Sequence, residues 1–95
     1  MNAITLTEVI NEECRDAEFS AHFEREMLIN DIAKMVIQFR RIAKLTQKEL
    51  AKKAHTTQPV IARIESGSDY RIPSLDLLTR LALAANVKLK LTITE

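Results

Sequence analysis

The side chains of this 95-residue chain that could take part in chemistry are amides, hydroxyls and cations, and they gather between residues 44 and 71. No catalytic set stands out. His22 and His55 have no cysteine or carboxylate cluster at metal-ligand spacing, and the single glycine, Gly67, rules out a glycine-rich phosphate loop. No nucleophile has an evident base beside it. We therefore expect no enzyme, no metal and no cofactor, but binding through hydrogen bonds and charge.

These polar residues fall on two short predicted helices joined by a turn. Thr46 and Glu49 form a capping box that starts a helix of about two turns. Thr57 is a good N-cap for a second helix, since its hydroxyl can satisfy a free backbone N–H, and Pro59 falls in the first turn of that helix. Gly67 can take the left-handed conformation that ends it. Two short helices joined by a turn, the second with a polar N-terminus, make a helix-turn-helix.

The stretch resembles the helix-turn-helix of the phage-repressor-like (Cro/C1, or XRE) family. The matching residues are Leu-Thr-Gln-x-x-Leu-Ala at 45–51, Thr-Thr-Gln at 56–58 and Ile-x-x-Ile-Glu-x-Gly at 61–67. His55 departs from the family, which usually has glycine in the turn, although histidine tolerates a positive φ better than most residues. The resemblance also implies that Arg40 pairs with Glu65 and ties the preceding helix to the recognition helix.

The geometry of such a motif places the second helix, residues 58–65, in the major groove of DNA with its N-terminus first. Gln58 is the expected base contact, because its amide can pair bidentately with adenine. Gln47 and Thr57 resemble family positions that bind phosphate at helix N-termini. The sequence therefore predicts a DNA-binding surface at the start of both helices.

Other residues of this surface have less specific expected roles. Val60 could contact a thymine methyl group, and Arg63 could reach a base edge or a phosphate. Pro59 stands where the family often has a polar residue, so readout of DNA shape is expected to contribute more. Lys44 and Arg71 are expected at phosphates, where they would strengthen binding to all DNA alike.

The net charge of +1 conceals a split between the two ends of the chain. Residues 1–31 carry a net charge of −6, and residues 32–95 carry +7. The basic part would suit DNA phosphates. The acidic part would suit a basic protein, or it is simply a solvated helix face, and charge alone favours neither interpretation.

Over nearly its whole length the chain resembles HigA-type antitoxins of bacterial type II toxin–antitoxin pairs. The shared order is an acidic N-terminal region, a long helix, the motif, a capped helix and a lysine-alternating strand. The resemblance implies that residues 1–30 bind a basic, RelE-like toxin that cleaves mRNA, while residues 31–95 bind DNA, dimerise and repress the operon. The alternative is an XRE-family regulator without a toxin partner. The expected toxin-binding residues are Glu12, Glu13, Phe19, Phe23, Glu24 and Met27. The apolar anchors among them could instead be internal core.

The pattern of apolar residues predicts an all-α, lambda-repressor-like bundle of about five helices with one C-terminal strand. The expected helices span residues 5–14, 20–44, 46–54, 57–67 and 74–85, the second with a possible break at Asn30 and Asp31. No apolar run is long enough to cross a membrane. One cysteine, Cys14, and a start without a basic region fit a cytoplasmic location.

Residues 87–94 alternate between apolar and polar side chains, which is typical of a half-buried strand. Since the chain offers no second strand of useful length, the simplest partner is the same segment of another copy, antiparallel across a two-fold axis. Pairing with the sheet of the toxin, or a frayed tail, is the alternative. Self-pairing would set two recognition helices about 34 Å apart and require a palindromic operator. The expected homodimer residues are Leu77, Leu81, Val87, Leu89, Leu91 and Ile93.

Overall fold

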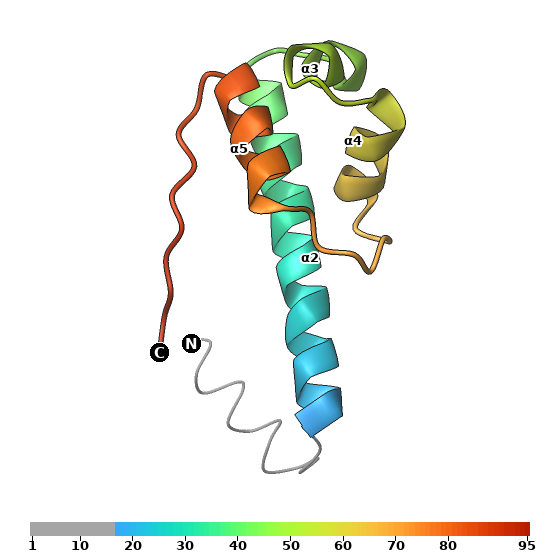
Figure 1. The fold of residues 1–95 in the computed structure, drawn as a ribbon, viewed down its shortest axis with the longest axis vertical. Coiled ribbons are helices and arrows are strands. Elements are labelled where there is room, and N and C mark those ends of the chain that lie inside the picture. The colour runs from blue at the N-terminus through green and yellow to red at the C-terminus, as the bar shows by residue number, and fades with distance from the viewer. Residues whose placement is uncertain (1–16) are drawn as a thin grey trace.

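Four helices make up the regular structure of residues 17–95, the part of the chain that the computed structural model describes (Figure 1). The helices are α2 (Ala17–Ile42), α3 (Gln47–Lys53), α4 (Gln58–Ser66) and α5 (Leu75–Ala84). The predicted all-α class is confirmed. The helix expected over residues 5–14 lies outside the described residues.

The long helix α2 is the support on which the rest is built. It runs the length of the molecule, and the shorter helices gather around its C-terminal half (Figure 1). The expected break at Asn30 and Asp31 is wrong. Both side chains are exposed to solvent, where they leave the backbone hydrogen bonds of the helix intact. Within residues 17–95, no helix combines the length and hydropathy needed to cross a membrane.

The two helix starts of the motif differ in how they are capped. Thr46 Oγ1 accepts from the Glu49 N–H at 3.0 Å, and Glu49 Oε1 accepts from the Thr46 N–H at 2.9 Å, so the capping box is confirmed. Thr57 does stand at the N-cap of α4, but its hydroxyl makes no capping bond, and that prediction is wrong. The reason is that Pro59 has no N–H to offer, and the Val60 N–H already donates to the Thr57 carbonyl at 3.1 Å.

Every described helix is followed by a residue in the left-handed region. These residues are Lys44 after α2, His55 after α3, Gly67 after α4 and Asn86 after α5, with φ between 57° and 67°. The expectations for the last three are confirmed. The turn of the motif is further held from α5, because Arg80 Nη1 donates to the carbonyls of Ala54 and His55, each at 3.0 Å.

The core takes one fully buried aliphatic side chain from each described helix. Val36, Leu50, Ile61 and Leu81 are the largest side chains with no meaningful exposure. Leu81 was expected at a dimer interface, and this prediction is wrong, because the residue lies at the centre of the core. Leu77 is also turned partly inward against the same core. The exposed apolar side chains of α5 are instead those of Leu75 and Leu83.

The C-terminal tail, residues 87–95, forms no strand in the described chain. Val87 and Leu89 pack partly buried against the core, whereas Leu91 and Ile93 are 73% and 92% exposed. A strand exists only when its backbone groups pair with those of a neighbour, and residues 17–86 offer it none. The predicted strand is therefore wrong for the single chain.

Gly67→Ala should lower the free energy of unfolding by about 1–2 kcal/mol, because alanine is strained in the left-handed region. The added methyl group would also meet Asn30 Oδ1 at 3.0 Å. Urea unfolding followed by circular dichroism measures the change. Combining it with Asn30→Ala removes the side-chain contact and should leave only the backbone part of the loss. A Gly67→Ala chain as stable as the original would contradict the left-handed turn.

Candidate nucleic-acid interface

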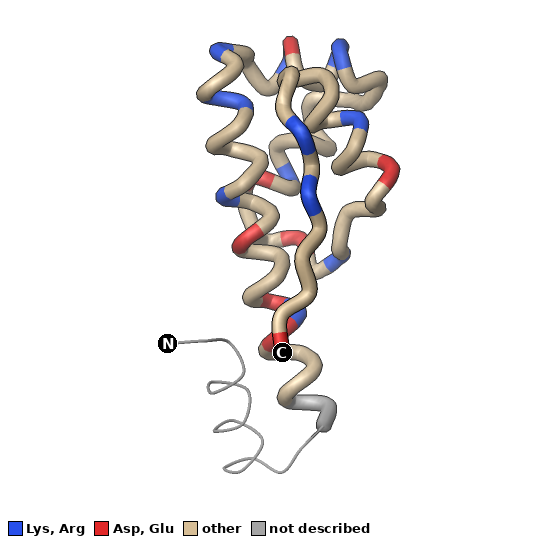
Figure 2. Tube along the Cα trace, turned by 90° about the vertical axis from the view of Figure 1, so that its left-hand side faces the viewer, with Lys and Arg blue, Asp and Glu red and all other residues tan. Residues whose placement is uncertain are grey.

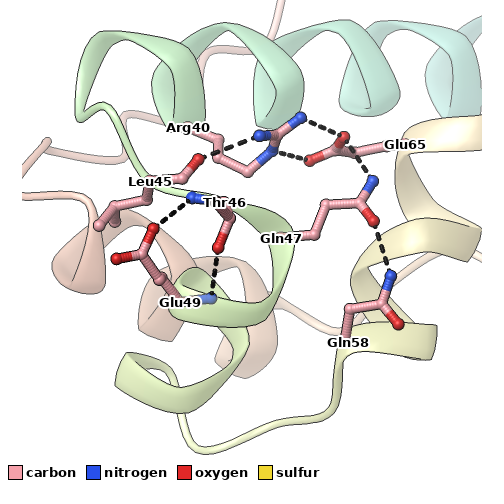
Figure 3. A network of polar contacts seen from close by, with 7 residues as sticks. All are labelled: Arg40, Leu45, Thr46, Gln47, Glu49, Gln58 and Glu65. Atoms are coloured by element: carbon pink, nitrogen blue, oxygen red, sulfur yellow. Dashed lines mark hydrogen bonds and ion pairs between the residues drawn. The ribbon is translucent and has the colours of Figure 1, made fainter.

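The pair implied for Arg40 and Glu65 is present and forms the base of the site. Arg40 Nε and Nη2 donate to the two carboxylate oxygens of Glu65 at 2.7 and 3.0 Å (Figure 3). The third donor of the guanidinium, Nη1, reaches the Leu45 carbonyl at 3.0 Å. This two-pronged geometry is the strong form of an ion pair. One arginine thus joins α2, the loop before α3, and the end of α4.

Glu65 is held in its charged form by these contacts. Its side chain is only 7% exposed. Burial raises the pKa of Glu65, but the hydrogen bonds from Arg40 and Gln47 and the charge of Arg40 lower it further, so it lies below its usual value of 4.5. The pairing therefore stabilises the fold fully above the ordinary carboxyl pKa, and this is lost as the pH falls through the lowered value. At neutral pH the carboxylate is ionised and only accepts hydrogen bonds.

A relay of amides runs from this carboxylate to the start of α4. Gln47 Nε2 donates to Glu65 Oε1 at 3.0 Å, and Gln58 Nε2 donates to Gln47 Oε1 at 2.9 Å (Figure 3). Since Glu65 can only accept, the amide of Gln47 must turn its NH₂ group inward, and its carbonyl then requires a donor from Gln58. Gln58 is left with its carbonyl oxygen and one N–H. That pair matches the N6 donor and N7 acceptor of adenine.

The other residues expected to contact DNA differ in their exposure and in their position relative to the relay. Thr57, Pro59 and Arg63 are exposed, and so is Lys44 in the turn between α2 and α3. Val60 is half-buried and lines an apolar groove on the far side of α4 from the relay. A cation that the sequence reasoning missed is Lys48, which lines a surface hollow with Gln47 and Gln58. In the sequence, only its position directly after Gln47 indicated that Lys48 would lie at this surface.

Arg71 is already paired. Its Nε and Nη2 donate to the carboxylate of Asp69 at 3.2 and 3.1 Å, and its backbone N–H donates to the same side chain at 3.0 Å. These bonds lower the pKa of Asp69 and raise that of Arg71. The guanidinium side of the pair is open to solvent, since the Arg71 side chain is 63% exposed and that of Asp69 is 20% exposed, so water weakens the pair. A phosphate would have to compete with Asp69 for this arginine.

The expected toxin-binding residues fall on and before the N-terminal half of α2. Phe23 is half-buried, Glu24 is exposed and Met27 is 39% exposed. Glu12, Glu13 and the side chain of Phe19 lie outside the described residues. The helix α2 runs continuously across the boundary expected between residues 30 and 31. Among residues 17–95, no group of histidine, cysteine or acidic side chains could hold a metal ion.

In a comparison with known families, residues 36–91 match the helix-turn-helix family HTH_3. The matched part is more than half of the chain, and it contains the whole hydrogen-bond relay from Arg40 to Gln58. Comparison with curated proteins and with solved structures found no match. Members of this family are XRE-type DNA-binding domains and typically not enzymes. The chain therefore belongs to the HTH_3 helix-turn-helix family of DNA-binding transcriptional regulators.

Proposed function

We propose that this chain is an antitoxin that represses its own operon and neutralises a basic, RelE-like toxin by direct binding. Residues 31–95 would bind DNA and dimerise, and residues 1–30 with the start of α2 would hold the toxin. The observation that carries the DNA-binding part is the relay that ends at Gln58. The alternative, an XRE-type regulator without a toxin partner, uses the same relay.

The relay supports a specific mode of reading DNA. With α4 in the major groove, the Gln58 amide would meet an adenine edge in a fixed orientation, because Gln47 and Glu65 leave it only one. Preorganising this side chain before DNA arrives removes part of the entropy that ordering it would cost. Lys44, Lys48 and Arg63 supply exposed positive charge for the phosphates on either side.

The toxin-binding part is supported by a surface that precedes the matched domain. Met27 is 39% exposed and Leu28 is exposed beside it, next to Glu24 and Glu26. Acidic residues mark this half of α2, whereas lysines and arginines are more frequent toward its other end (Figure 2). An apolar centre with an acidic rim suits a basic protein partner.

The dimer is supported by the tail. Beyond Val87, whose N–H donates to the Ala82 carbonyl at 2.9 Å, the backbone of residues 88–95 makes no hydrogen bond within the described chain. Leu91 and Ile93 are exposed as well. Pairing with the tail of a second copy would satisfy these groups and cover both side chains. It would also place two recognition helices for a palindromic operator.

Gln58→Ala should weaken binding to the operator by roughly 1–3 kcal/mol and relax the preference at one base pair, because it removes a paired base contact. Lys44→Ala should weaken specific and non-specific DNA alike and reduce the salt slope by about 1. Titrations against a set of operator variants at several salt concentrations measure both effects. Gln38→Ala, which changes an exposed amide of α2 outside the relay, is the control. Base preference unchanged by Gln58→Ala would refute the role of this residue.

Met27→Glu should abolish neutralisation of the toxin and leave DNA binding intact, because it puts a charge in the apolar centre of the proposed surface. A loss of at least about 2 kcal/mol in toxin affinity is expected. Co-expression growth rescue and a direct binding titration measure it. Ile42→Glu, which changes an exposed apolar residue at the other end of α2, is the matched control. If only the control variant loses neutralisation, the toxin site lies elsewhere on the molecule.

Of the two variants Leu91→Pro and Thr92→Pro, one should dissociate the dimer and the other should leave it intact. Backbone N–H groups of successive residues in a strand point to opposite edges, so only one of Leu91→Pro and Thr92→Pro removes a bond to the partner. Both residues are exposed in the single chain, so the fold itself should be unaffected. Sedimentation velocity measures the outcome. Two equally stable dimers would move the interface off the tail and onto the exposed face of α5, at Leu75 and Leu83.

A further inference from the structure

A groove lies beside the recognition helix, between α2, α4 and the loop over residues 67–74. Its volume is about 250 Å³. The walls are aliphatic or proline side chains from both helices, the loop and the start of α5. These wall residues are Ile29, Ile32, Val60, Ile64, Ile72, Pro73 and Leu77. An apolar cavity of about 150 Å³ is already large enough to take up benzene, so this groove has room for one ring.

The polar side chains of the groove leave one positive charge unpaired. Arg63, Arg71 and Asp69 contribute to its lining. Asp69 is bonded to Arg71 through both carboxylate oxygens. The guanidinium of Arg63 has no hydrogen-bond or ion-pair partner within residues 17–95, although it lies near enough to Asp69 to lower the pKa of that carboxyl group. Apolar walls with one free guanidinium select an apolar body that carries one negative charge.

The loop that closes the groove is tied to the long helix. Arg25 Nε of α2 donates to the Tyr70 carbonyl at 2.9 Å, and Ser66 and Ser68 are joined through their hydroxyls at 2.7 Å. The next helix begins at once with the Ser74 cap, whose hydroxyl accepts from the Leu77 N–H at 3.1 Å. The groove is thus formed before any ligand arrives, which favours a small molecule over a segment that must be ordered on binding.

We infer that this groove binds a small monocarboxylic acid with a compact apolar body of about one ring, its carboxylate held by Arg63. A carboxylate matches the planar fork of a guanidinium with two parallel hydrogen bonds. Binding of the acid would also weaken DNA binding, because Arg63 and Val60 belong to α4. While Arg63 holds the carboxylate, it is not free to contact the DNA duplex. This second effect rests on the proposed DNA contact of Arg63, whereas the binding itself does not.

Cyclohexanecarboxylate is the probe, because it does not absorb where tyrosine fluoresces. The chain has one tyrosine, Tyr70, and no tryptophan, so intrinsic fluorescence reports on the groove loop alone. The full chain without DNA should bind the probe with a dissociation constant on the order of 1 mM. Cyclohexanecarboxamide, which lacks the charge, and acetate, which lacks the ring, should each bind at least about tenfold more weakly. Equal affinity for the acid and the amide would overturn the assignment of Arg63.

Two variants separate the charge from the walls. Arg63→Gln should reduce affinity for the acid about tenfold and leave that for the amide unchanged, and Ile72→Ala should weaken both several-fold. Arg41→Gln, which changes an exposed arginine of α2 outside the groove, should change neither. If Ile72→Ala alters sedimentation instead of ligand binding, the groove is a contact between copies and the proposal is wrong. The proposal is equally wrong if no fluorescence or calorimetric signal develops at 10-fold excess over the expected constant, ~10 mM.

The effect on DNA is tested separately. At matched ionic strength, cyclohexanecarboxylate but not acetate should weaken operator binding several-fold, and Arg63→Gln should remove the difference. Linkage requires that the operator weaken acid binding by the same factor. Acid binding without this coupling would refute the contact of Arg63 with DNA and leave the site standing. If the chain binds no operator but still binds the acid, the proposed function is refuted and the acid-binding site is not.

Discussion

The ionised carboxylate of Glu65 is the constraint on which the arrangement of the helices depends. A charge that is 7% exposed is destabilising unless it is paired and hydrogen-bonded. Arg40 and Gln47 supply those bonds from α2 and α3, so α4 can sit only where both can reach its last turn. Apolar contacts between the helices would tolerate sliding, whereas three directed bonds to one carboxylate do not. The same bonds determine which way Gln47 and then Gln58 face.

A second constraint is the way in which short helices are stopped. The three helices of the matched domain that follow α2 have only 7, 9 and 10 residues, so a shift of one residue at an end would misplace a large part of each. A left-handed residue after every described helix sets those ends. Three of these four residues are not glycine, and each therefore adds strain of order 1 kcal/mol. At His55 two bonds from Arg80 hold the strained turn.

How much of the structure could be predicted from the sequence depends on how far apart along the chain the interacting groups lie. The capping box of Thr46 and Glu49 was predictable because donor and acceptor are three residues apart. The cap at Thr57 failed for an equally local reason, the missing N–H of Pro59. The position of Leu81 on α5 was misjudged, because seven of the ten residues of that helix are leucine or alanine and neighbouring orientations of the helix bury similar apolar area. The folded chain places Leu81 inside, in the same buried cluster as Val36 and Leu50.

Contacts that cross the fold left little trace in the sequence. The bonds from Arg80 to the motif turn and from Arg25 to the Tyr70 carbonyl join residues 25, 26 or 45 positions apart, and a backbone acceptor carries no residue type to recognise. The Arg40–Glu65 pair was expected from family resemblance alone, since neither periodicity nor spacing indicates it. The left-handed backbone of Lys44 was not expected, because lysine is common inside helices. The residues of the motif were thus recognisable in the sequence, whereas most of the long-range bonds that connect them were not.

The unbroken course of α2 limits how its two ends can influence one another. Met27 and Arg40 are separated by thirteen residues of continuous helix, which is about 20 Å along the axis. A partner side chain in contact with Met27 would therefore lie outside hydrogen-bond reach of the relay, and a packed helix does not transmit a small displacement as a change in register. An effect of this contact on DNA binding would then come from other parts of the partner, through steric overlap with the duplex or through their charge. These two effects respond differently to salt. Charge is screened over a Debye length of about 8 Å at physiological salt, whereas steric overlap is not screened by salt.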